Sequence, residues 1–214
     1  MQEEMQWFVK PAAMSGVILA AMLLRVTASS AEPAPSNPCA GATSVAVLAG
    51  PEEPGERLVV TGTVFAPDGV TPAPGVFLYV YNTDATGHYN SERGLPPRLH
   101  GWMKSGPDGR YEYRTIKPAS YPGSRIPAHV HTQLWGGGYT PQAGPELNFE
   151  GDPFLKSSER EHSASLGRFA FIRSARKDAQ GVWRVEQDLR LKPSGDSLSN
   201  ILHGIQPCGV RPSS

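Results

Sequence analysis

The chain of 214 residues carries 20 lysines and arginines against 20 aspartates and glutamates, so its formal net charge is zero. This balance argues against nucleic acid or an anionic membrane surface as a partner, because both select strongly basic proteins. The 23 glycines and 21 prolines interrupt the sequence too often for long helices, and no internal repeat or heptad pattern is present.

The first 31 residues have the pattern of an export signal. Lys10 precedes an apolar stretch from Ala12 to Leu24, and the small residues Ala28–Ala31 offer a cleavage point. The apolar stretch is short for a membrane span, so we expect export to the periplasm or the cell exterior, with a membrane anchor as the alternative. About 180 residues would remain after cleavage, which is enough for one domain with a single core.

Two cysteines, Cys39 and Cys208, lie near the two ends of the expected mature chain. In an oxidising compartment they can form one disulfide, which would contribute ~5 kcal/mol in the chain-entropy model. The alternative is a pair of unpaired buried thiols. Neither cysteine lies near the histidines considered below, so we expect no metal-binding role for them.

Short apolar segments separated by glycine and proline predict a domain built from strands over residues 55–214, after an irregular segment at 32–54. Four segments fit strands: Leu58–Phe65, Val76–Tyr81, Arg110–Ile116 and His129–Trp135. Residues 95–103 are less regular. Strands at such short intervals indicate an all-β, antiparallel sandwich.

The last third of the chain predicts one helix and one hairpin. Phe154–His162 fits a short helix, preceded by a structural turn at Glu150-Gly-Asp152. Phe169–Ser174 and Val182–Leu191 fit the two strands of a hairpin around Asp178-Ala-Gln-Gly181.

The segment Tyr121-Pro-Gly-Ser-Arg-Ile-Pro-Ala-His129-Val-His131 contains two histidines one residue apart in an extended run. Side chains alternate along a strand, so Val130 and Leu134 can face a core while His129 and His131 share the opposite face. Two neutral imidazoles held side by side on a strand form a preorganised pair of metal ligands. A His-x-His pair alone also fits an ordinary polar strand face.

Two tyrosines strengthen the metal hypothesis. Tyr121 lies eight positions before His129, and Tyr89 ends the run Asp84-Ala-Thr-Gly-His-Tyr89. The four side chains combine hard phenol oxygens with imidazoles, and phenolate favours a highly charged ion such as ferric iron over zinc. Taken singly, each tyrosine also fits a loop residue that caps the edge of a sandwich.

The segment from about Leu58 to Phe154 resembles the intradiol ring-cleavage dioxygenases, the family of protocatechuate 3,4-dioxygenase and catechol 1,2-dioxygenase. The resemblance rests on ordered motifs across about half of the chain. These are Gly62-Thr-Val, Pro74-Gly-Val-Phe-Leu-Tyr-Val-Tyr81, Asp84-Ala-Thr-Gly-His-Tyr89, Gly106-Pro-Asp-Gly-Arg-Tyr111, Thr115-Ile-Lys-Pro-Ala-Ser-Tyr121-Pro, Pro127-Ala-His-Val-His131 and Phe149-Glu-Gly-Asp-Pro153. It implies an immunoglobulin-like β-sandwich with a metal site in loops at one edge.

The resemblance also implies roles for individual residues. Fe(3+) would be bound by Tyr89, Tyr121, His129 and His131, with Tyr121 as the tyrosinate that leaves when substrate binds. The substrates would be a small aromatic diol and O2, and the product a cis,cis-muconate. The sequence leaves the natural diol and the oligomeric state open.

Two positions depart from the family pattern. Well-known members carry a substrate-facing arginine three positions before the first histidine, where this chain has Ile126, and Arg125 one place earlier is the candidate for that catalytic role. Glu146 stands where those members carry glutamine. Loss of a fixed cation and gain of a carboxylate near the pocket should disfavour acidic substrates such as protocatechuate, so we expect a neutral catechol or larger diol.

Two other classes of function remain as alternatives. One is an exported β-sandwich that binds a metal or an aromatic compound without turnover, and the other is a purely structural transthyretin-like domain without metal. Ferric tyrosinate colour, and its response to a catechol, would discriminate among the three. The remaining histidines are assigned surface or structural roles: His88, His100, His162 and His203.

Overall fold

The computed structural model describes residues 39, 41–92 and 95–196, which belong to one compact unit of the chain. The predicted signal peptide at 1–31 and Cys208 lie outside these residues, so the leader and the disulfide stay predictions. In the part of the chain that is described, no helix has the length and apolar character needed to cross a membrane.

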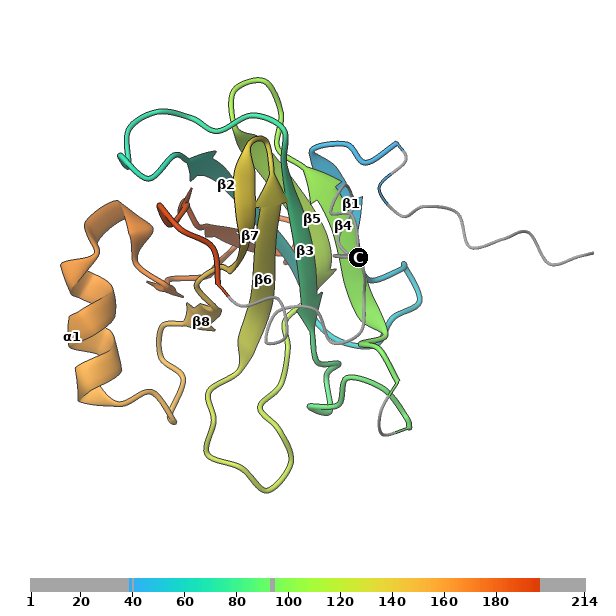
Figure 1. Cartoon of the computed structure of the whole chain (residues 1–214). Helices are drawn as coiled ribbons and strands as arrows, with labels where there is room; N and C mark the ends of the chain where they lie inside the picture. The colour runs from blue at the N-terminus through green and yellow to red at the C-terminus, as the bar shows by residue number, and fades with distance from the viewer. Residues whose placement is uncertain (1–38, 40, 93–94, 197–214) are drawn as a thin grey trace, which may run out of the picture. The chain divides into compact units, whose positions relative to one another are not determined.

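Two six-stranded sheets form a sandwich (Figure 1). The first sheet has the order β1-β5-β2-β11-β10, with β12 also paired to β2. Its strands are β1 (Val45–Val47), β2 (Arg57–Phe65), β5 (Arg110–Ile116), β10 (Arg176–Lys177), β11 (Trp183–Glu186) and β12 (Leu189–Arg190). The predicted all-β sandwich is therefore confirmed.

The second sheet carries the predicted ligand histidines, and its order is β4-β3-β6-β8-β9, with β7 also paired to β6. Its strands are β3 (Val76–Asn82), β4 (Leu99–Lys104), β6 (His129–Gly136), β7 (Tyr139–Ala143), β8 (Leu147–Phe149) and β9 (Ile172–Arg173). The helix α1 (Ser157–Ser165) and the 3₁₀ turn η1 (Gly167–Phe169) connect β8 to β9. The observed helix lies three residues beyond the predicted one, because Glu159 caps it by accepting a 2.7 Å hydrogen bond from the backbone of Lys156.

Antiparallel pairing dominates the centre of each sheet. β2 is antiparallel to β5, and β3 is antiparallel to both β4 and β6. Four pairings are parallel instead: β1 with β5, β11 with β2, β12 with β2, and β8 with β9. The sheets are thus mixed rather than wholly antiparallel, because these short strands join their partners by crossovers and not by hairpins.

The core lies between the sheets and is formed by alternate residues of the long strands. Its fully buried members include Leu58, Val60, Leu78, Val80, Val130 and Leu134. Burial of a side chain such as Leu134 contributes about 1.5–3 kcal/mol. Since Val130 and Leu134 face this core, His129 and His131 lie on the opposite face of β6, as the alternation predicted.

Three parts of the strand prediction need correction. The segment expected to be irregular at 32–54 contains β1, and the less regular segment contains β4. The predicted turn around Asp178 is present, but the strand that pairs with β11 is β10 and not Phe169–Ser174, which supplies β9 of the other sheet. Sequence alternation identifies a strand but not its partner, since the hydrogen bonds come from residues far away in the chain.

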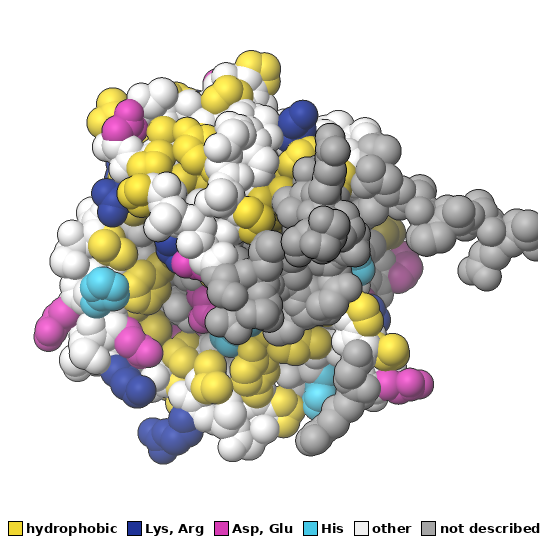
Figure 2. All heavy atoms as spheres, in the orientation of Figure 1, with side chains coloured by type: hydrophobic (Ala, Val, Ile, Leu, Met, Phe, Trp, Pro, Cys, Tyr) yellow, Lys and Arg dark blue, Asp and Glu magenta, His cyan; other side chains and the backbone are white. Residues whose placement is uncertain are grey.

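Figure 2 shows charged side chains of both signs scattered round the margin of the face in view, with hydrophobic and uncharged groups between them. Among the described residues on this face, neither sign forms a large continuous patch. This distribution agrees with the zero net charge of the sequence.

Candidate metal centre

The two histidines are positioned by the central strand β6. His129 is buried and His131 is half-buried. Tyr81 of β3 lies directly opposite His131 in the register, and the two rings stack with centroids 4.6 Å apart. Just before the strand, the backbone N–H of Ala128 donates to Asp152 at 3.0 Å. The predicted turn at Asp152 thus anchors the start of β6, and both imidazoles sit on a rigid element.

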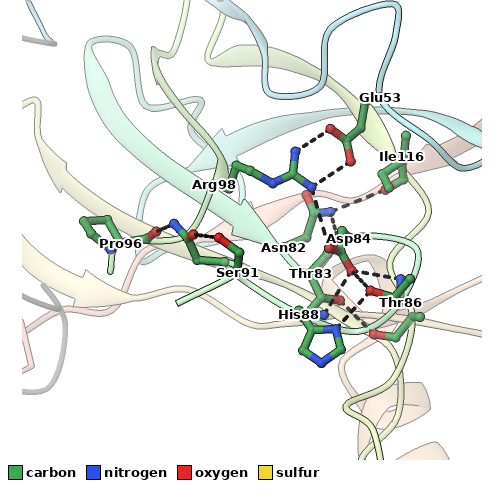
Figure 3. Close-up of polar contacts among 12 residues, drawn as sticks. Glu53, Asn82, Thr83, Asp84, Thr86, His88, Ser91, Pro96, Arg98 and Ile116 are labelled. Carbon is green, nitrogen blue, oxygen red and sulfur yellow. Dashed lines mark hydrogen bonds and ion pairs between the residues drawn. The ribbon is translucent and has the colours of Figure 1, made fainter. Parts of the chain in front are cut away.

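Tyr89 is presented by the loop between β3 and β4. Asp84 shapes the start of this loop by accepting the backbone N–H of Thr86 at 2.8 Å (Figure 3). At the other end, Arg98 donates its backbone N–H to the carbonyl of Tyr89 at 2.7 Å. The Arg98 guanidinium binds the carboxylate of Glu53 at 2.5 and 2.9 Å (Figure 3). Charged and backbone contacts therefore hold the loop on both sides of Tyr89.

Tyr121 comes from the loop between β5 and β6, which leaves the same end of the sandwich as the Tyr89 loop (Figure 1). The hydroxyl of Thr83 donates to the carbonyl of Ala119 at 2.7 Å, and the N–H of Ala119 donates to the carbonyl of Asp84 at 3.2 Å. These bonds join the two loops. As a result, two tyrosines that are 32 positions apart in the sequence meet at one point.

The structure brings all four predicted ligands together. The hydroxyl of Tyr89 contacts that of Tyr121 and lies 2.7 Å from Nε2 of His131. The hydroxyl of Tyr121 lies 2.9 Å from Nε2 of His129, and the two Nε2 atoms are 3.0 Å apart. Ligand atoms bound at right angles to one cation with bonds of 2.0–2.1 Å are separated by about 2.9 Å. The spacing therefore fits a single small cation.

The hydrogen bond made by Nδ1, the outer nitrogen of each imidazole, determines whether Nε2, the inner nitrogen, carries a proton or a lone pair. Nδ1 of His129 lies 2.7 Å from the carbonyl of Pro127, which can only accept, so Nδ1 carries the proton. Nδ1 of His131 lies 3.1 Å from the carboxylate of Glu146, which fixes the same tautomer. In the neutral rings both Nε2 atoms then present lone pairs to each other. Two nitrogens and two phenol oxygens thus converge on one point with lone pairs available, and this donor set fits a bound metal ion.

The pKa shifts of the two phenols also fit a bound metal ion. Burial raises the pKa of Tyr89 far above its ordinary value of 10, and the neighbouring Tyr121 hydroxyl raises it further. Burial also raises the pKa of Tyr121. Without a cation both side chains stay neutral, and a trivalent ion would supply the charge that makes phenolates stable there. The His131 ring N–H acts in the opposite direction on Glu146, whose pKa it holds below the ordinary value.

Arg125, the predicted catalytic arginine, is not brought to this cluster. Its side chain is exposed, and its guanidinium lies 5.9 Å from the ring centre of Phe154. The neighbouring Ile126 is also exposed, at 48 %. Neither residue is among the described residues that line the pocket beside the tyrosines, so a catalytic role for Arg125 stays a prediction.

Sequence reasoning missed the residues that surround the ligands. A pocket of ≈ 440 Å³ opens beside the cluster, within the range typical of small-molecule sites. Its described lining is Tyr81, Tyr89, Leu95, Pro96, Pro97, Tyr121 and His131. Only the cross-strand register reveals Tyr81, and Leu95–Pro97 forms a wall because the hydrogen-bonded loop folds back. That fold-back is not encoded by any local pattern.

Glu146 lies near the pocket, as the sequence predicted, but its contact with a ligand histidine was not predicted. Its carboxylate lies within 4.8 Å of ring nitrogens of both histidines. It contacts Nδ1 of His131, whereas the four ligand atoms meet on the Nε2 side. The carboxylate therefore lies behind a ligand, and it is not among the described residues that line the pocket.

Two tyrosines and two histidines that converge at the end of a β-sandwich define a class of non-haem metal site. A dioxygenase family model (Dioxygenase_C) matches residues 33–193. The chain belongs to the intradiol ring-cleavage dioxygenase family, which implies a non-haem iron cofactor.

Named relatives agree with this membership. The chain is 32 % identical over 126 residues to chlorocatechol 1,2-dioxygenase of Rhodococcus opacus, an alignment that covers 50 % of this chain and 48 % of that one. It is 33 % identical over 113 residues to the β chain of protocatechuate 3,4-dioxygenase of Burkholderia cepacia, covering 47 % and 48 %. The chain thus spans about half the length of the curated relatives it matches.

One solved structure is matched over a larger share of its length. The dioxygenase domain of a dioxygenase–carbohydrate-binding fusion protein from Streptomyces sp. SirexAA-E superposes with a TM-score of 0.54 at 27 % identity. The match covers 68 % of this chain and 86 % of that domain. The sandwich that carries the four side chains is therefore similar to a dioxygenase domain.

Proposed function

We propose that the protein is a non-haem Fe(III) intradiol dioxygenase, which cleaves a catechol-type diol with O2 between the two hydroxylated carbons to a cis,cis-muconate type product. The observation that carries this proposal is that the Nε2 atoms of His129 and His131, 3.0 Å apart, converge with the two phenol oxygens of Tyr89 and Tyr121. A ligand set with phenolate oxygens suits ferric iron better than zinc. Membership in the family supports the reaction class.

In this proposal Tyr89, His129 and His131 would hold the ion, and Tyr121 would be the ligand that a bound diol replaces. When bound, a ferric ion supplies a centre that binds both diol oxygens and activates the ring toward O2. Two phenolates and a hydroxide would balance its charge, so a diol that brings two anionic oxygens would require one phenolate to leave. Because burial raises the pKa of Tyr121, its released phenolate takes a proton from a substrate hydroxyl.

The backbone supports the choice of Tyr121 as the side chain that leaves. The carbonyl of Tyr89 accepts the N–H of Arg98 at 2.7 Å, within a loop that the Glu53 ion pair also holds. Tyr121 is followed by an exposed turn, where the N–H of Ser124 donates to its carbonyl at 3.1 Å and Gly123 has open space around it. The Tyr121 side can therefore move at lower cost than the Tyr89 side.

The pocket wall supports a substrate without an anionic substituent. Leu95, Pro96 and Pro97 are apolar, and the described lining includes no lysine or arginine. An acidic diol would lose its hydration there without gaining a counter-ion. We therefore propose a neutral catechol or a larger uncharged aromatic diol as the substrate class.

Oxygen consumption by the purified, iron-loaded protein tests the function. We expect a red-brown protein whose absorption band shifts on addition of catechol, with faster turnover of catechol and hydroxyquinol than of protocatechuate. A strong preference for protocatechuate would refute the substrate class. Colour without oxygen uptake would favour a binding module, and a colourless protein without iron would favour a structural domain.

We also propose that the protein is exported, with the signal peptide removed near Ala31 and with Cys39 bonded to Cys208. The leader pattern and the position of the two cysteines at opposite ends of the expected mature chain support this. The intact mass of protein from the native host, measured with and without reductant and alkylation, tests both points. An uncleaved chain with two alkylatable thiols in the non-reduced sample would contradict them.

A further inference from the structure

The two ligand histidines differ in what holds their outer nitrogens. His129 donates Nδ1–H to the backbone carbonyl of Pro127 at 2.7 Å, a neutral acceptor from its own segment. His131 donates to the carboxylate of Glu146, which comes from the loop between β7 and β8, at 3.1 Å. Only His131 therefore has an anion behind it. On the inner side, by contrast, each ring contacts one tyrosine hydroxyl through Nε2.

Backbone pairing sets the position of Glu146. In the antiparallel pairing of β6 with β8, His129 lies opposite Asn148 and Val130 lies opposite Leu147. Extending this register by one residue puts position 146 beside His131. On the other side, the N–H of Gly144 donates to the carbonyl of Thr132 at 2.9 Å. The chain is thus fixed to β6 on both sides of Glu146, and the contact does not depend on a flexible loop.

The carboxylate of Glu146 makes its ion-pair contact with His131, and a ring nitrogen of His129 also lies within 4.8 Å of it. No lysine or arginine of the described chain forms an ion pair with this carboxylate, whereas the nearby Glu150 is paired with Arg160. Glu146 is also absent from the described lining of the pocket. Its charge therefore acts through the imidazole, and not by direct contact with a substrate.

We propose that Glu146 is a positioning residue that fixes the tautomer and orientation of His131 and adds negative charge to the ligand set, so that the site favours the ferric over the ferrous ion. An acceptor behind a metal-bound imidazole orients the ring and makes its inner nitrogen a stronger donor. A carboxylate does both, while a neutral amide oxygen would do only the first. The inference rests on the proposed iron site, and it gives the departure at position 146 a specific role.

Two substitutions separate orientation from charge. Glu146→Gln keeps an acceptor of the same size but removes the charge, so we expect iron to be retained while the Fe(III)/Fe(II) reduction potential rises. Glu146→Ala removes both, so the affinity for iron should fall roughly 10- to 100-fold, the usual effect of deleting such a partner, and iron should be lost faster to a ferric chelator. Glu150→Gln is the matched control, because it removes a nearby exposed carboxylate that does not contact a ligand.

The readouts are the metal content after gel filtration, the rate of iron release, the reduction potential and the charge-transfer band, with circular dichroism to verify folding. Wild-type protein that holds iron while Glu146→Ala releases it no faster and has the same potential would overturn the inference and leave the proposed function intact. Wild-type protein without iron would overturn the proposed function itself. A potential that rises equally in Glu150→Gln would show a general surface-charge effect and would also overturn the inference.

Discussion

The two outer faces of the sandwich are built from different residues. On the first sheet, the outward side of β5 carries charged groups that are exposed or half-exposed, namely Arg110, Glu112 and Arg114. On the second sheet, the outward side of β3, β4 and β6 carries aromatic groups, namely Phe77, Tyr79, Tyr81, Trp102 and Trp135. Trp135 and Tyr79 are almost fully buried even though they face away from the central core.

The aromatic face leads directly to the candidate metal centre. Tyr79 packs on Trp102 with ring centroids 4.3 Å apart, and it also contacts Tyr81 at 5.3 Å. Tyr81 in turn stacks on His131 at 4.6 Å. A strand that is packed on both faces is stiffer than one with a solvated face, so β6 can hold its ligands within the small tolerances that a metal site needs. The charged face supports no comparable site among the described residues.

The largest expected effect is the loss of activity caused by a substitution at the end of the aromatic face, where the phenols lie. Tyr121→Phe removes one oxygen from the four-atom cluster and leaves the ring in place. We expect turnover of catechol to fall to background, because the proposed charge balance and the proton acceptor are both lost. Oxygen uptake and the visible spectrum measure this. Tyr139→Phe, on β7, is the control and should retain activity; wild-type rates in Tyr121→Phe would exclude the assigned role.

The second prediction concerns packing on the same face. Trp135→Ala should destabilise the fold by about 3–5 kcal/mol, since a fully buried aromatic side chain is replaced by a cavity. Trp135→Phe keeps a ring to stack on Phe77 and should lose clearly less. Chemical denaturation followed by circular dichroism gives both values. A loss below about 1 kcal/mol for Trp135→Ala would mean that this face does not contribute a second core.

The contrast between the faces explains how much could be predicted from the sequence. Tyr111 and Tyr113 alternate with charged residues along β5, so that strand and its buried side follow from period-two patterning. In β3 both faces are apolar, and the pattern predicts a strand covered on two sides without saying what covers it. The burial of Tyr79 and Tyr81 depends on partners from β4 and β6, which only the folded register brings together.

The same distinction applies to the candidate site. Tyr89, Tyr121, His129 and His131 carry their chemistry in their residue types, and their motifs supplied the grouping before any coordinates. Arg125 is a candidate by its nearness in sequence to the expected position, and its exposed guanidinium lies over the ring of Phe154. Glu146 was expected near the pocket, and it contacts the pocket-lining His131, but which side of that ring it faces is set by cross-strand pairing, which a linear motif does not encode.

A smaller loss of stability is expected at the ion pair that links the segment before β2 to the segment before β4. Arg98, next to β4, binds Glu53, which precedes β2, and this hydrogen bond is the main cause that holds the pKa of Glu53 below its ordinary value of 4.5. A lowered pKa means that the pair stabilises the fold above pH 4.5, and that this contribution is lost as the pH falls through the folded-state value.

Glu53→Gln should therefore cost less than about 1 kcal/mol at pH 7, as for other ion pairs at a surface. The difference from wild type should disappear in acid. Urea unfolding at pH 7 and below pH 4 measures it, with the exposed neighbour Glu52→Gln as the control. An equal difference at both pH values would show that Glu53 acts through its size and not its charge.

The smallest effect should come from the charged face itself. Arg114 and Glu112 form an ion pair at 2.7 Å, but the arginine side chain is 58 % exposed, so solvent screens the attraction. Arg114→Ala should change stability by no more than about 0.5 kcal/mol and leave iron content and turnover unchanged. A double-mutant cycle with Glu112→Ala isolates the pair. A coupling above about 1 kcal/mol would mean that the charged face also contributes substantially to stability, and that the aromatic face differs from it only in supporting the metal centre.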